Sequence, residues 1–166
     1  MKIGYCNTVI KLTPISKQHQ SLYQQLYQSD AVMNYVCSPL SDAACLRSFD
    51  SLLGQLDNPN KRVCFAIEIE ETGLDVGLLD AKHAKEAAET EVGILLLPEF
   101  HGRGMAKQAH QLLFSRMQQH QTNRFIARCH VDNQAAHHLY QKLGFKQLSN
   151  NQNKQYITWE KKSGKG

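Results

Sequence analysis

The stretch PEFHGRGMAK, residues 98–107, has residue types and a spacing that suit an anion. Gly102 and Gly104 carry no Cβ, so a ligand can approach the backbone closely there. A helical pattern follows, and the first N–H groups of a helix lack internal partners and attract negative charge. Arg103 and Lys107 add positive charge, and Ala106 keeps the first helical turn narrow. The stretch is either an ordinary turn between a strand and a helix or a phosphate-binding turn.

Two known phosphate-binding motifs do not fit these residues. The P-loop requires GxxxxGK[ST], and neither its spacing nor its Lys-Ser/Thr pair occurs here. The dinucleotide fingerprint requires GxGxxG or GxGxxA, but counting from Gly102 places Lys107 at the third small position. The sequence therefore indicates neither a P-loop nucleotide site nor a Rossmann-type site.

The elements on both sides of the turn must hold it in place. Before it, the run from Glu91 to Pro98 is short, aliphatic and closed by proline, which predicts a central strand buried on both faces. After it, apolar residues at i, i+4, i+7, i+8 and i+12 predict an amphipathic helix from about Gly104 to His120. These apolar residues are Met105, Ala109, Leu112, Leu113 and Met117. The turn is expected to connect a buried strand to a long helix.

The N-terminal third is predicted to be mostly helical. Residues 8–12 alternate apolar and polar side chains, as a strand does, and a Thr-Pro pair follows them. Ser16 is the expected N-cap of a helix that ends near Gln28, and a shorter helical stretch spans residues 31–36. Asp42 is the expected cap of a third helix. Its apolar face is formed by Leu46, Phe49, Leu52, Leu53 and Leu56.

The rest of the chain alternates between strands and helices. Residues 63–69 and 76–81 are predicted strands joined by a turn, and the run from Glu91 is the third of these antiparallel strands. Residues 125–131 predict another strand, and Asn133 and Gly144 are placed to cap and to end a short helix. Residues 145–148 and 155–159 supply the last short strands. No repeat or linker divides residues 1–166, so we expect one α+β domain with a mixed sheet.

Composition and charge exclude several classes of protein. The formal net charge is only +4, and the basic residues are scattered apart from Lys161, Lys162 and Lys165, so the chain does not have the basic face of a nucleic-acid-binding protein. The modest positive charge suits an anionic small ligand. The amino terminus has no apolar signal segment, and no stretch reaches the length of a membrane-spanning helix. We expect a cytoplasmic protein, monomeric or homodimeric, with no nucleic-acid partner and no membrane association.

Cysteine and histidine spacing does not predict a metal site. The five cysteines form an odd set without a CxxC pair, which is typical of reduced thiols in a cytoplasmic protein. The eight histidines include no HExxH motif. His137 and His138 are adjacent, so they leave a helix about 100° apart and are poorly placed to chelate one ion. We therefore expect no metal cofactor.

The order strand, HGRGMA, long helix, strand and then residues 133–145 resembles the GNAT superfamily of acyl-CoA-dependent N-acyltransferases. The family's pyrophosphate turn has the pattern Q/R-x-x-G-x-G/A, in which Gly104 and Ala106 match, whereas His101 stands where the family has Gln or Arg. The segment NQAAHHLYQKLGF resembles the second family signature, N-x-x-A-x-x-L-Y-x-K-x-G-F. Residues 8–15 are similar to the start of the RimJ/RimL-like subgroup of ribosomal-protein N-terminal acetyltransferases. The resemblance implies a GNAT-like mixed, mostly antiparallel sheet flanked by helices.

The resemblance also implies how acetyl-CoA is held. Backbone groups of Leu95, Leu96 and Leu97 pair with the pantetheine arm like an added strand, and an N–H near Leu96 polarises the acyl carbonyl. The pyrophosphate lies against the turn formed by His101, Gly102, Arg103, Gly104, Met105, Ala106 and Lys107. Arg103, Lys107 and Lys142 are candidates for phosphate contacts, with a surface charge as the alternative. Asn133 is a candidate for a ligand hydrogen bond, an N-cap, or both.

Tyr140 and Glu91 are the candidate catalytic residues implied by the resemblance. Tyr140 would protonate the leaving thiolate, because a phenol of pKa about 10 can serve a thiol of pKa about 8.5. Periodicity alone favours a different interpretation, in which Tyr140 fills the apolar face of its helix. Glu91 lies on the strand expected to carry the acyl group, where a carboxylate takes the ammonium proton directly or through water. The alternative is a solvated residue at the start of that strand.

The expected activity is direct transfer of an acetyl group to a primary amine, without a covalent enzyme intermediate. An α-amine titrates near pH 8 and a lysine near 10.4, so activating lysine costs roughly 3 kcal/mol more at neutral pH, and a weak base suits an N-terminal amine. The subgroup resemblance also favours a protein N-terminus as the acceptor. The alternatives are a small amine, such as a polyamine or an aminoglycoside, and an acyl-CoA-binding module without catalysis.

Overall fold

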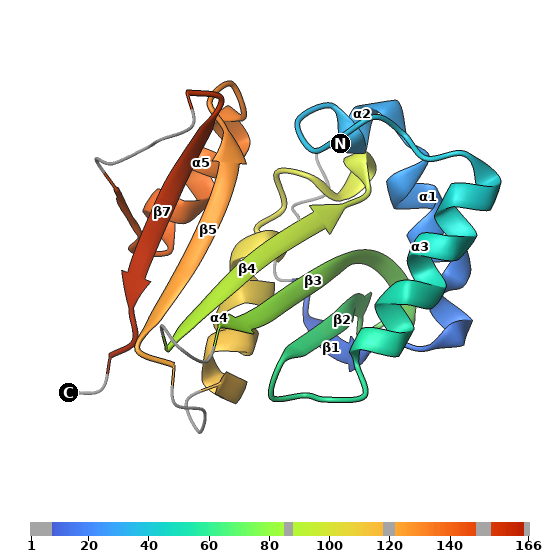
Figure 1. Cartoon of the computed structure of the whole chain (residues 1–166), viewed down its shortest axis with the longest axis horizontal. Coiled ribbons are helices and arrows are strands. Elements are labelled where there is room, and N and C mark those ends of the chain that lie inside the picture. Colours follow the sequence, from blue (N-terminus) through green and yellow to red (C-terminus); the bar gives the residue numbers. More distant parts are fainter. Residues whose placement is uncertain (1–7, 85–87, 118–121, 149–153, 165–166) are drawn as a thin grey trace.

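A computed structural model describes residues 8–84, 88–117, 122–148 and 154–164 of the chain. Its centre is a seven-stranded sheet in the order β1-β2-β3-β4-β5-β7-β6 (Figure 1). The strands are β1 Ile10–Pro14, β2 Arg62–Ile69, β3 Leu74–Ala84, β4 Glu89–Leu96, β5 Arg124–His130, β6 Lys146–Gln147 and β7 Tyr156–Lys162. Neighbouring strands are antiparallel except β4 and β5, which are parallel. The expected mixed, mostly antiparallel sheet is confirmed.

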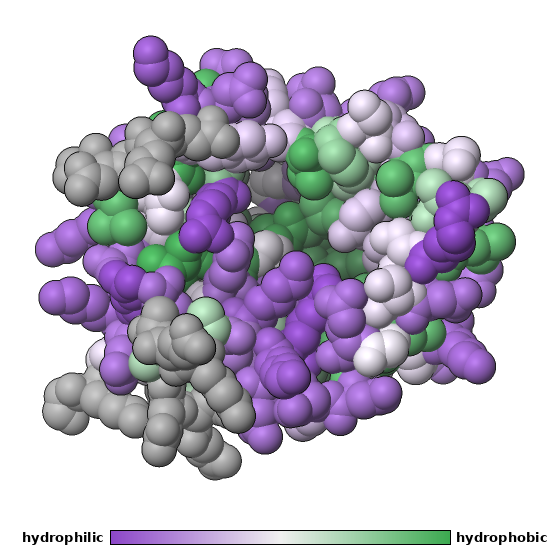
Figure 2. All heavy atoms as spheres, in the orientation of Figure 1, coloured by the Kyte–Doolittle hydropathy of each residue, from purple (hydrophilic) through white to green (hydrophobic). Residues whose placement is uncertain are grey.

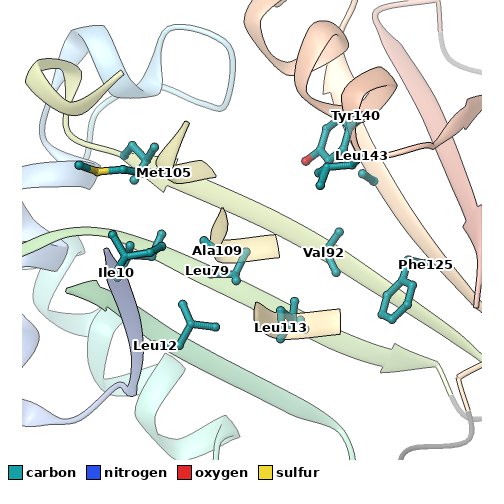
Figure 3. Close-up of a cluster of buried hydrophobic side chains, with 14 of the residues drawn as sticks. Ile10, Leu12, Leu79, Val92, Met105, Ala109, Leu113, Phe125, Tyr140 and Leu143 are labelled. Atoms are coloured by element: carbon teal, nitrogen blue, oxygen red, sulfur yellow. The ribbon is translucent and has the colours of Figure 1, made fainter. Parts of the chain in front are cut away.

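Helices cover both faces of the sheet (Figure 1). One face carries the 3-10 turn η1 Lys17–His19 and the helices α1 Gln20–Tyr27, α2 Asp30–Met33 and α3 Asp42–Gln55; the other carries α4 Met105–Met117 and α5 Gln134–Lys142. Successive residues of a strand point to opposite faces, and Leu78 and Leu79 of β3 accordingly belong to different apolar clusters. The cluster with Leu79 includes Leu113 and Tyr140 (Figure 3), and the cluster with Leu78 includes Phe49. The sheet therefore separates two buried layers.

The helices follow the sequence prediction with two differences. The N-cap of α3 is Ser41, whose hydroxyl accepts from the Ala44 N–H at 3.4 Å, so the prediction that Asp42 caps this helix is wrong. Ser16 precedes η1 and α1 as predicted, and Gly144, with φ +82°, follows α5. Leu46 was predicted to face inward, but its side chain is 41% exposed, so that prediction is wrong. The buried stripe of α3 is Cys45, Phe49 and Leu52, and Leu46 lies about 100° away from it on the helix. The helix after the glycine turn is described as far as Met117; residues 118–120 of the predicted helix lie outside the described residues.

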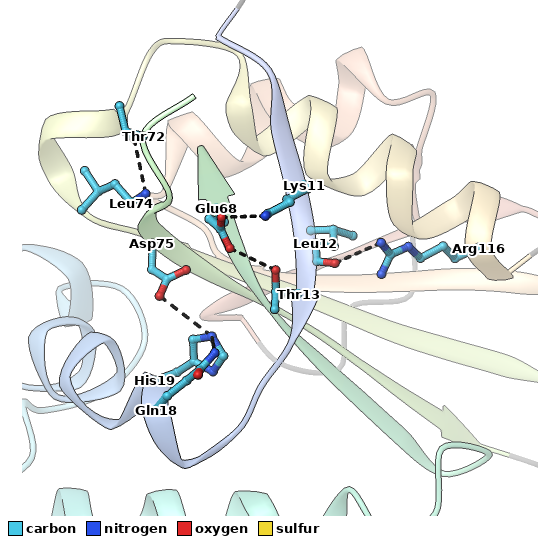
Figure 4. Close-up of polar contacts among 10 residues, drawn as sticks. All are labelled: Lys11, Leu12, Thr13, Gln18, His19, Glu68, Thr72, Leu74, Asp75 and Arg116. Atoms are coloured by element: carbon cyan, nitrogen blue, oxygen red, sulfur yellow. Dashed lines mark hydrogen bonds and ion pairs between the residues drawn. The ribbon is translucent and has the colours of Figure 1, made fainter. Parts of the chain in front are cut away.

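Polar contacts fix the edge strand β1 on both sides (Figure 4). On the β2 side, Lys11 Nζ lies 2.8 Å from Glu68 Oε1, and the Thr13 hydroxyl donates to Glu68 Oε2 at 3.3 Å. On the outer side, Arg116 of α4 donates from Nη2 to the Leu12 carbonyl at 3.0 Å. Because α4 starts directly after the glycine turn, these contacts also fix the direction in which that turn presents its backbone.

Strand β4 is not buried on both faces, contrary to the sequence prediction. Thr90, Val92 and Leu96 are buried, whereas Glu91 and Gly93 between them are exposed. The exposed positions lie at and beyond the place where β5 stops pairing with β4. The aliphatic run therefore marks a strand whose second face is open at Glu91 and Gly93 and covered again at Leu95 and Leu97. None of the helices formed by the described residues is long and apolar enough to cross a bilayer.

Candidate active site

Strands β4 and β5 form a parallel pair over a short stretch only. Residues 89–91 pair with residues 124–126, and beyond these positions the two strands separate. Figure 1 shows them diverging toward their C-terminal ends, and Figure 2 shows the surface hollowed there, with hydrophobic side chains inside. We call this hollow the β4–β5 opening, bounded by residues 92–96 of β4 and 127–130 of β5. An unpaired strand edge of this kind can bind an extended ligand through backbone hydrogen bonds.

Side chains connect the two sides of the β4–β5 opening at both ends. At the narrow end, Nη1 of Arg128 on β5 lies 2.5 Å from Oε2 of Glu91 on β4, and both side chains are about half exposed. At the wide end, the ring of Tyr35, which follows α2, stacks on His130 with 5.6 Å between ring centroids. His130 also contacts Tyr156 edge to face at 5.6 Å. The opening is thus framed by an ion pair and by an aromatic stack.

Hydrogen bonding to β3 determines which residues of β4 face the opening. The Leu97 N–H donates to the Val76 carbonyl at 2.9 Å. In an antiparallel pair every second residue exchanges bonds with its partner, so the register directs the backbone groups of Leu95 and Leu97 to β3. Leu96 and Ile94 direct theirs to the opposite edge. Of the three leucines predicted to hold pantetheine, Leu96 is therefore the one whose backbone faces the opening.

A short 3-10 turn, η3 Pro98–Phe100, folds the chain back after β4. The Phe100 N–H donates to the Leu97 carbonyl at 3.0 Å, and the His101 N–H donates to the Pro98 carbonyl at 3.1 Å. The turn brings the imidazole of His101 back to the strand, where its Nε2 lies 2.9 Å from the Leu96 carbonyl oxygen. His101 therefore contacts the strand that borders the opening.

The two glycines of the turn adopt the left-handed backbone region. Gly102 has φ +72° and Gly104 has φ +77°, a conformation that residues with a Cβ rarely adopt. A Cβ added at either position would meet no described atom within 4 Å. The backbone conformation, rather than crowding by the protein, therefore requires glycine, and the space beside the turn is open. The Arg103 guanidinium carbon lies 5.3 Å from the centroid of the Phe100 ring at the same turn.

Helix α4 presents unpaired backbone donors to this turn. Its first intrahelical bond runs from the Gln108 N–H to the Gly104 carbonyl at 3.1 Å. The N–H groups of Met105, Ala106 and Lys107 precede that bond, so they have no acceptor within the helix. The Met105 side chain is buried, whereas the Lys107 side chain is exposed beside the turn. These donors and the positive end of the helix dipole suit a phosphate group.

Tyr140 lies on α5 in the same buried layer as α4. Its side chain is 4% exposed and contacts the ring of Phe145 at 5.2 Å and, perpendicular to it, the ring of His110 at 5.8 Å. Burial raises the pKa of the Tyr140 phenol well above its usual range, so the phenol is protonated at neutral pH. Figure 3 shows its hydroxyl oxygen directed away from α5 and toward β4, on the face of the sheet that carries Val92.

The two remaining predicted residues lie at the ends of α5. Asn133 Oδ1 accepts a hydrogen bond from the Ala136 N–H at 3.1 Å, so its predicted N-cap role is confirmed. Lys142 is exposed in the last turn of the helix. Contacts of either residue with a ligand stay a prediction.

Comparison with known proteins places this geometry in a family. A family model described as the acetyltransferase (GNAT) domain matches residues 10–146. This chain belongs to the GNAT acetyltransferase family. The expected enzyme class, an acetyl-CoA-dependent N-acetyltransferase, is thereby confirmed. No curated protein sequence is significantly similar to the chain.

Solved structures of acetyltransferases with different acceptors share this fold. Spermidine N-acetyltransferase from Vibrio cholerae, in complex with CoA and spermine, is 17% identical with a TM-score of 0.80, over 95% of this chain and 97% of that one. An acetyltransferase from Salmonella typhimurium that modifies the N-terminal serine of ribosomal protein L7/L12 is 18% identical with a TM-score of 0.76, over 94% and 96%. An aminoglycoside acetyltransferase in complex with coenzyme A is 10% identical with a TM-score of 0.77, over 93% and 95%. At these identities the likeness establishes the fold alone.

In this GNAT acetyltransferase the two candidate catalytic side chains lie on opposite faces of the sheet. Val92 belongs to the same buried cluster as Tyr140, on the α4 and α5 side. Glu91 precedes Val92 on the strand, so its side chain points to the other face, which α3 covers farther along the sheet. The β4–β5 opening lies between them.

Several residues around the opening have no counterpart in the sequence predictions. Ile94 could have been found, because it is two residues from Leu96 and shares its edge of the strand. The partnership of Arg128 with Glu91, and that of Tyr35 with His130, join residues distant in the sequence, and no local pattern marks them. Among the described residues, no group of three or more His, Cys, Asp or Glu side chains could hold a metal ion.

Proposed function

We propose that this enzyme transfers an acetyl group from acetyl-CoA directly to the α-amine of a protein N-terminus. The observation that carries the proposal is the β4–β5 opening, with a buried phenol on one face of the sheet and a carboxylate on the other. A thioester placed in such an opening has its sulfur near the phenol and its carbonyl open to an amine from the opposite face. That arrangement supports direct attack and needs no covalent enzyme intermediate.

The donor side rests on backbone groups. The pyrophosphate of acetyl-CoA would lie against the N–H groups of residues 104–107, with Arg103, Lys107 and Lys142 as charged contacts. The pantetheine arm would run along the edge of β4 that Ile94 and Leu96 present. The Leu96 N–H would then polarise the thioester carbonyl and stabilise the oxyanion that forms on attack. The CoA-bound relatives described above support the choice of this donor.

Tyr140 is the proposed general acid. When the tetrahedral intermediate collapses, the C–S bond breaks and the sulfur leaves as a thiolate, which takes the phenol proton. Burial keeps the phenol protonated, so its proton is available at the moment when the C–S bond breaks. The phenolate then takes a proton from solvent, and the proton removed from the amine is released to solvent, which restores both groups for the next cycle.

The acceptor side favours an amine with a single positive charge. The carboxylates of β3 and β4 nearest the opening on this face are already paired: Glu91 with Arg128, and Asp80 with Arg62 at 2.8 Å. A polyamine or an aminoglycoside carries several charges and is bound best by unpaired carboxylates. Aromatic rings, Tyr35 and His130, frame the wide end instead.

The chemistry of proton removal supports the same acceptor. At pH 7 about a tenth of an α-amine is already neutral, whereas only about one lysine side chain in 2,500 is neutral. The Glu91 carboxylate accepts a hydrogen bond from Arg128 through Oε2. Such a site is sufficient for an α-amine, with Glu91 as the proposed proton acceptor directly or through water.

The test is the rate of CoA thiol release from acetyl-CoA with a panel of acceptors. The panel contains lysine-free peptides with different first residues, the same peptides N-acetylated and carrying one lysine, spermidine, and an aminoglycoside. We expect the highest kcat/KM with peptides that have a free α-amine. A higher value with spermidine or the aminoglycoside would overturn the acceptor assignment, and no release with any amine would instead support an acyl-CoA-binding module.

A further inference from the structure

We propose that His101 is a positioning residue that holds the acyl-bearing strand to the phosphate-binding turn through the Leu96 carbonyl. This inference rests on the proposed placement of the donor, not on the identity of the acceptor. It differs from a direct pyrophosphate contact, which is what the position of His101 in the turn pattern implies. The two roles predict different behaviour toward a donor that lacks the pyrophosphate.

The contact itself is specific. Nε2 of His101 lies 2.9 Å from the Leu96 carbonyl oxygen. A carbonyl only accepts, so the imidazole donates from Nε2, in either its neutral or its protonated form. The η3 turn makes the contact possible, because two backbone bonds fold the chain so that residue 101 returns to residue 96.

The carbonyl that His101 binds faces the donor site. Leu97 bonds to Val76 of β3, so the adjacent Leu96 directs its carbonyl and its N–H to the β4–β5 opening. An exposed edge carbonyl would otherwise pair with the amide N–H of a pantetheine arm. With this carbonyl held by His101, the strand offers the arm the Leu96 N–H and the backbone groups of Ile94. The His101 side chain thus determines which backbone groups at the open edge of β4 are available to bind acetyl-CoA.

The same bond couples two parts of the donor site. His101 is followed directly by Gly102 and Gly104, whose left-handed conformations shape the turn before α4. Leu96 ends β4. A bond between residues 96 and 101 therefore fixes the distance between the phosphate donors of α4 and the N–H that faces the acyl carbonyl. Its loss should move the thioester relative to the Leu96 N–H even when no pyrophosphate is present.

The test compares His101→Leu and His101→Gln with two donors, acetyl-CoA and S-acetyl-pantetheine, on whichever amine the parent acetylates fastest. Gln keeps an N–H donor at similar reach, and Leu removes it. We expect His101→Leu to lower kcat/KM about tenfold with both donors, the equivalent of one hydrogen bond near 1.4 kcal/mol, and His101→Gln to stay within about threefold of the parent. Lys107→Leu is the matched control for a pyrophosphate contact, and it should lower kcat/KM with acetyl-CoA alone.

The outcomes separate the two roles. A loss in His101→Leu that is confined to acetyl-CoA would make His101 a pyrophosphate ligand and overturn the proposal, as would parent-like activity with both donors. If the parent acetylated no amine at all, the proposed function would fail by itself. The same comparison would then be made with the Kd of CoA and of pantetheine, and the proposal requires His101→Leu to weaken both. Thermal unfolding of each variant checks that the exposed substitution leaves the fold intact.

Discussion

His110 on α4 should make the folded protein sensitive to mild acid. Its side chain is fully buried, Nδ1 lies 2.8 Å from the Ala106 carbonyl, and Nε2 has no hydrogen-bond partner among the described residues. Burial lowers the pKa of His110 from 6.5 to about 4, although the bond to Ala106 opposes the shift. The neutral imidazole is therefore favoured in the folded state, and the unfolded chain binds the proton more tightly.

The sign and size of the effect follow by linkage. Because the folded pKa lies below the unfolded one, the contribution is fully present above pH 6.5 and is lost as the pH falls from 6.5 toward 4. A shift of this size corresponds to about 3 kcal/mol, at 1.36 kcal/mol per pKa unit. Other groups titrate in the same range, so the His110 contribution must be isolated by a difference between proteins.

The assay is urea unfolding of the parent and of His110→Leu at several pH values between 7.5 and 4. Leu cannot be protonated, so the unfolding free energy of the variant should fall less steeply as the pH is lowered. The difference in unfolding free energy between the parent and the variant should therefore shift by about 3 kcal/mol in favour of the variant between pH 7.5 and pH 4. His138→Leu is the matched control, because His138 is exposed on α5. Curves for the parent and for His110→Leu that stay parallel down to pH 4 would refute the reasoning.

Three further predictions concern the donor and acceptor groups. Tyr140→Phe should lower kcat about 100-fold or more while leaving the Kd of acetyl-CoA unchanged, because it removes only the acidic proton; kcat within threefold of the parent would show that the phenol is a packing residue. Gly104→Ala should destabilise the turn by about 1 kcal/mol and weaken acetyl-CoA binding by calorimetry, because φ is +77° there; Gly54→Ala, on the exposed side of α3, is the control and should bind normally. Glu91→Gln should lower kcat/KM for an α-amine peptide at most about tenfold at pH 7 and recover at pH 9, where the amine deprotonates without help; a loss that persists at pH 9 would assign Glu91 a different role.

The sequence predicts those parts of the candidate site that lie within short motifs. The glycine turn, the Asn133 cap and the position of Tyr140 all lie in short segments whose spacing can be recognised. The hydrophobic run of β4 predicted a strand but not its open face, because exposure there depends on where β5 stops pairing. That point is set by contacts between residues more than 30 positions apart, such as Glu91 with Arg128.

The contacts that side chains make at the site could not be predicted from short sequence motifs either. The bond from His101 to Leu96 depends on the tightness of the η3 turn, and the same letters in an open loop would leave the imidazole in solvent. The burial of His110 follows from the packing of α4 against α5, which periodicity marks as an apolar face without identifying the polar residue it encloses. The sequence thus predicted the elements and the motif residues, and the tertiary structure determined their contacts.

The proposed activity of this enzyme is acetylation of the α-amine of a peptide chain. The most direct measurement gives the protein acetyl-CoA and one peptide that has both a free α-amine and an internal lysine, and locates the added acetyl group by tandem mass spectrometry. We expect acetyl on the α-amine, at a rate that Tyr140→Phe lowers about 100-fold. Acetyl on the lysine alone, or at both amines with equal rates, would contradict it.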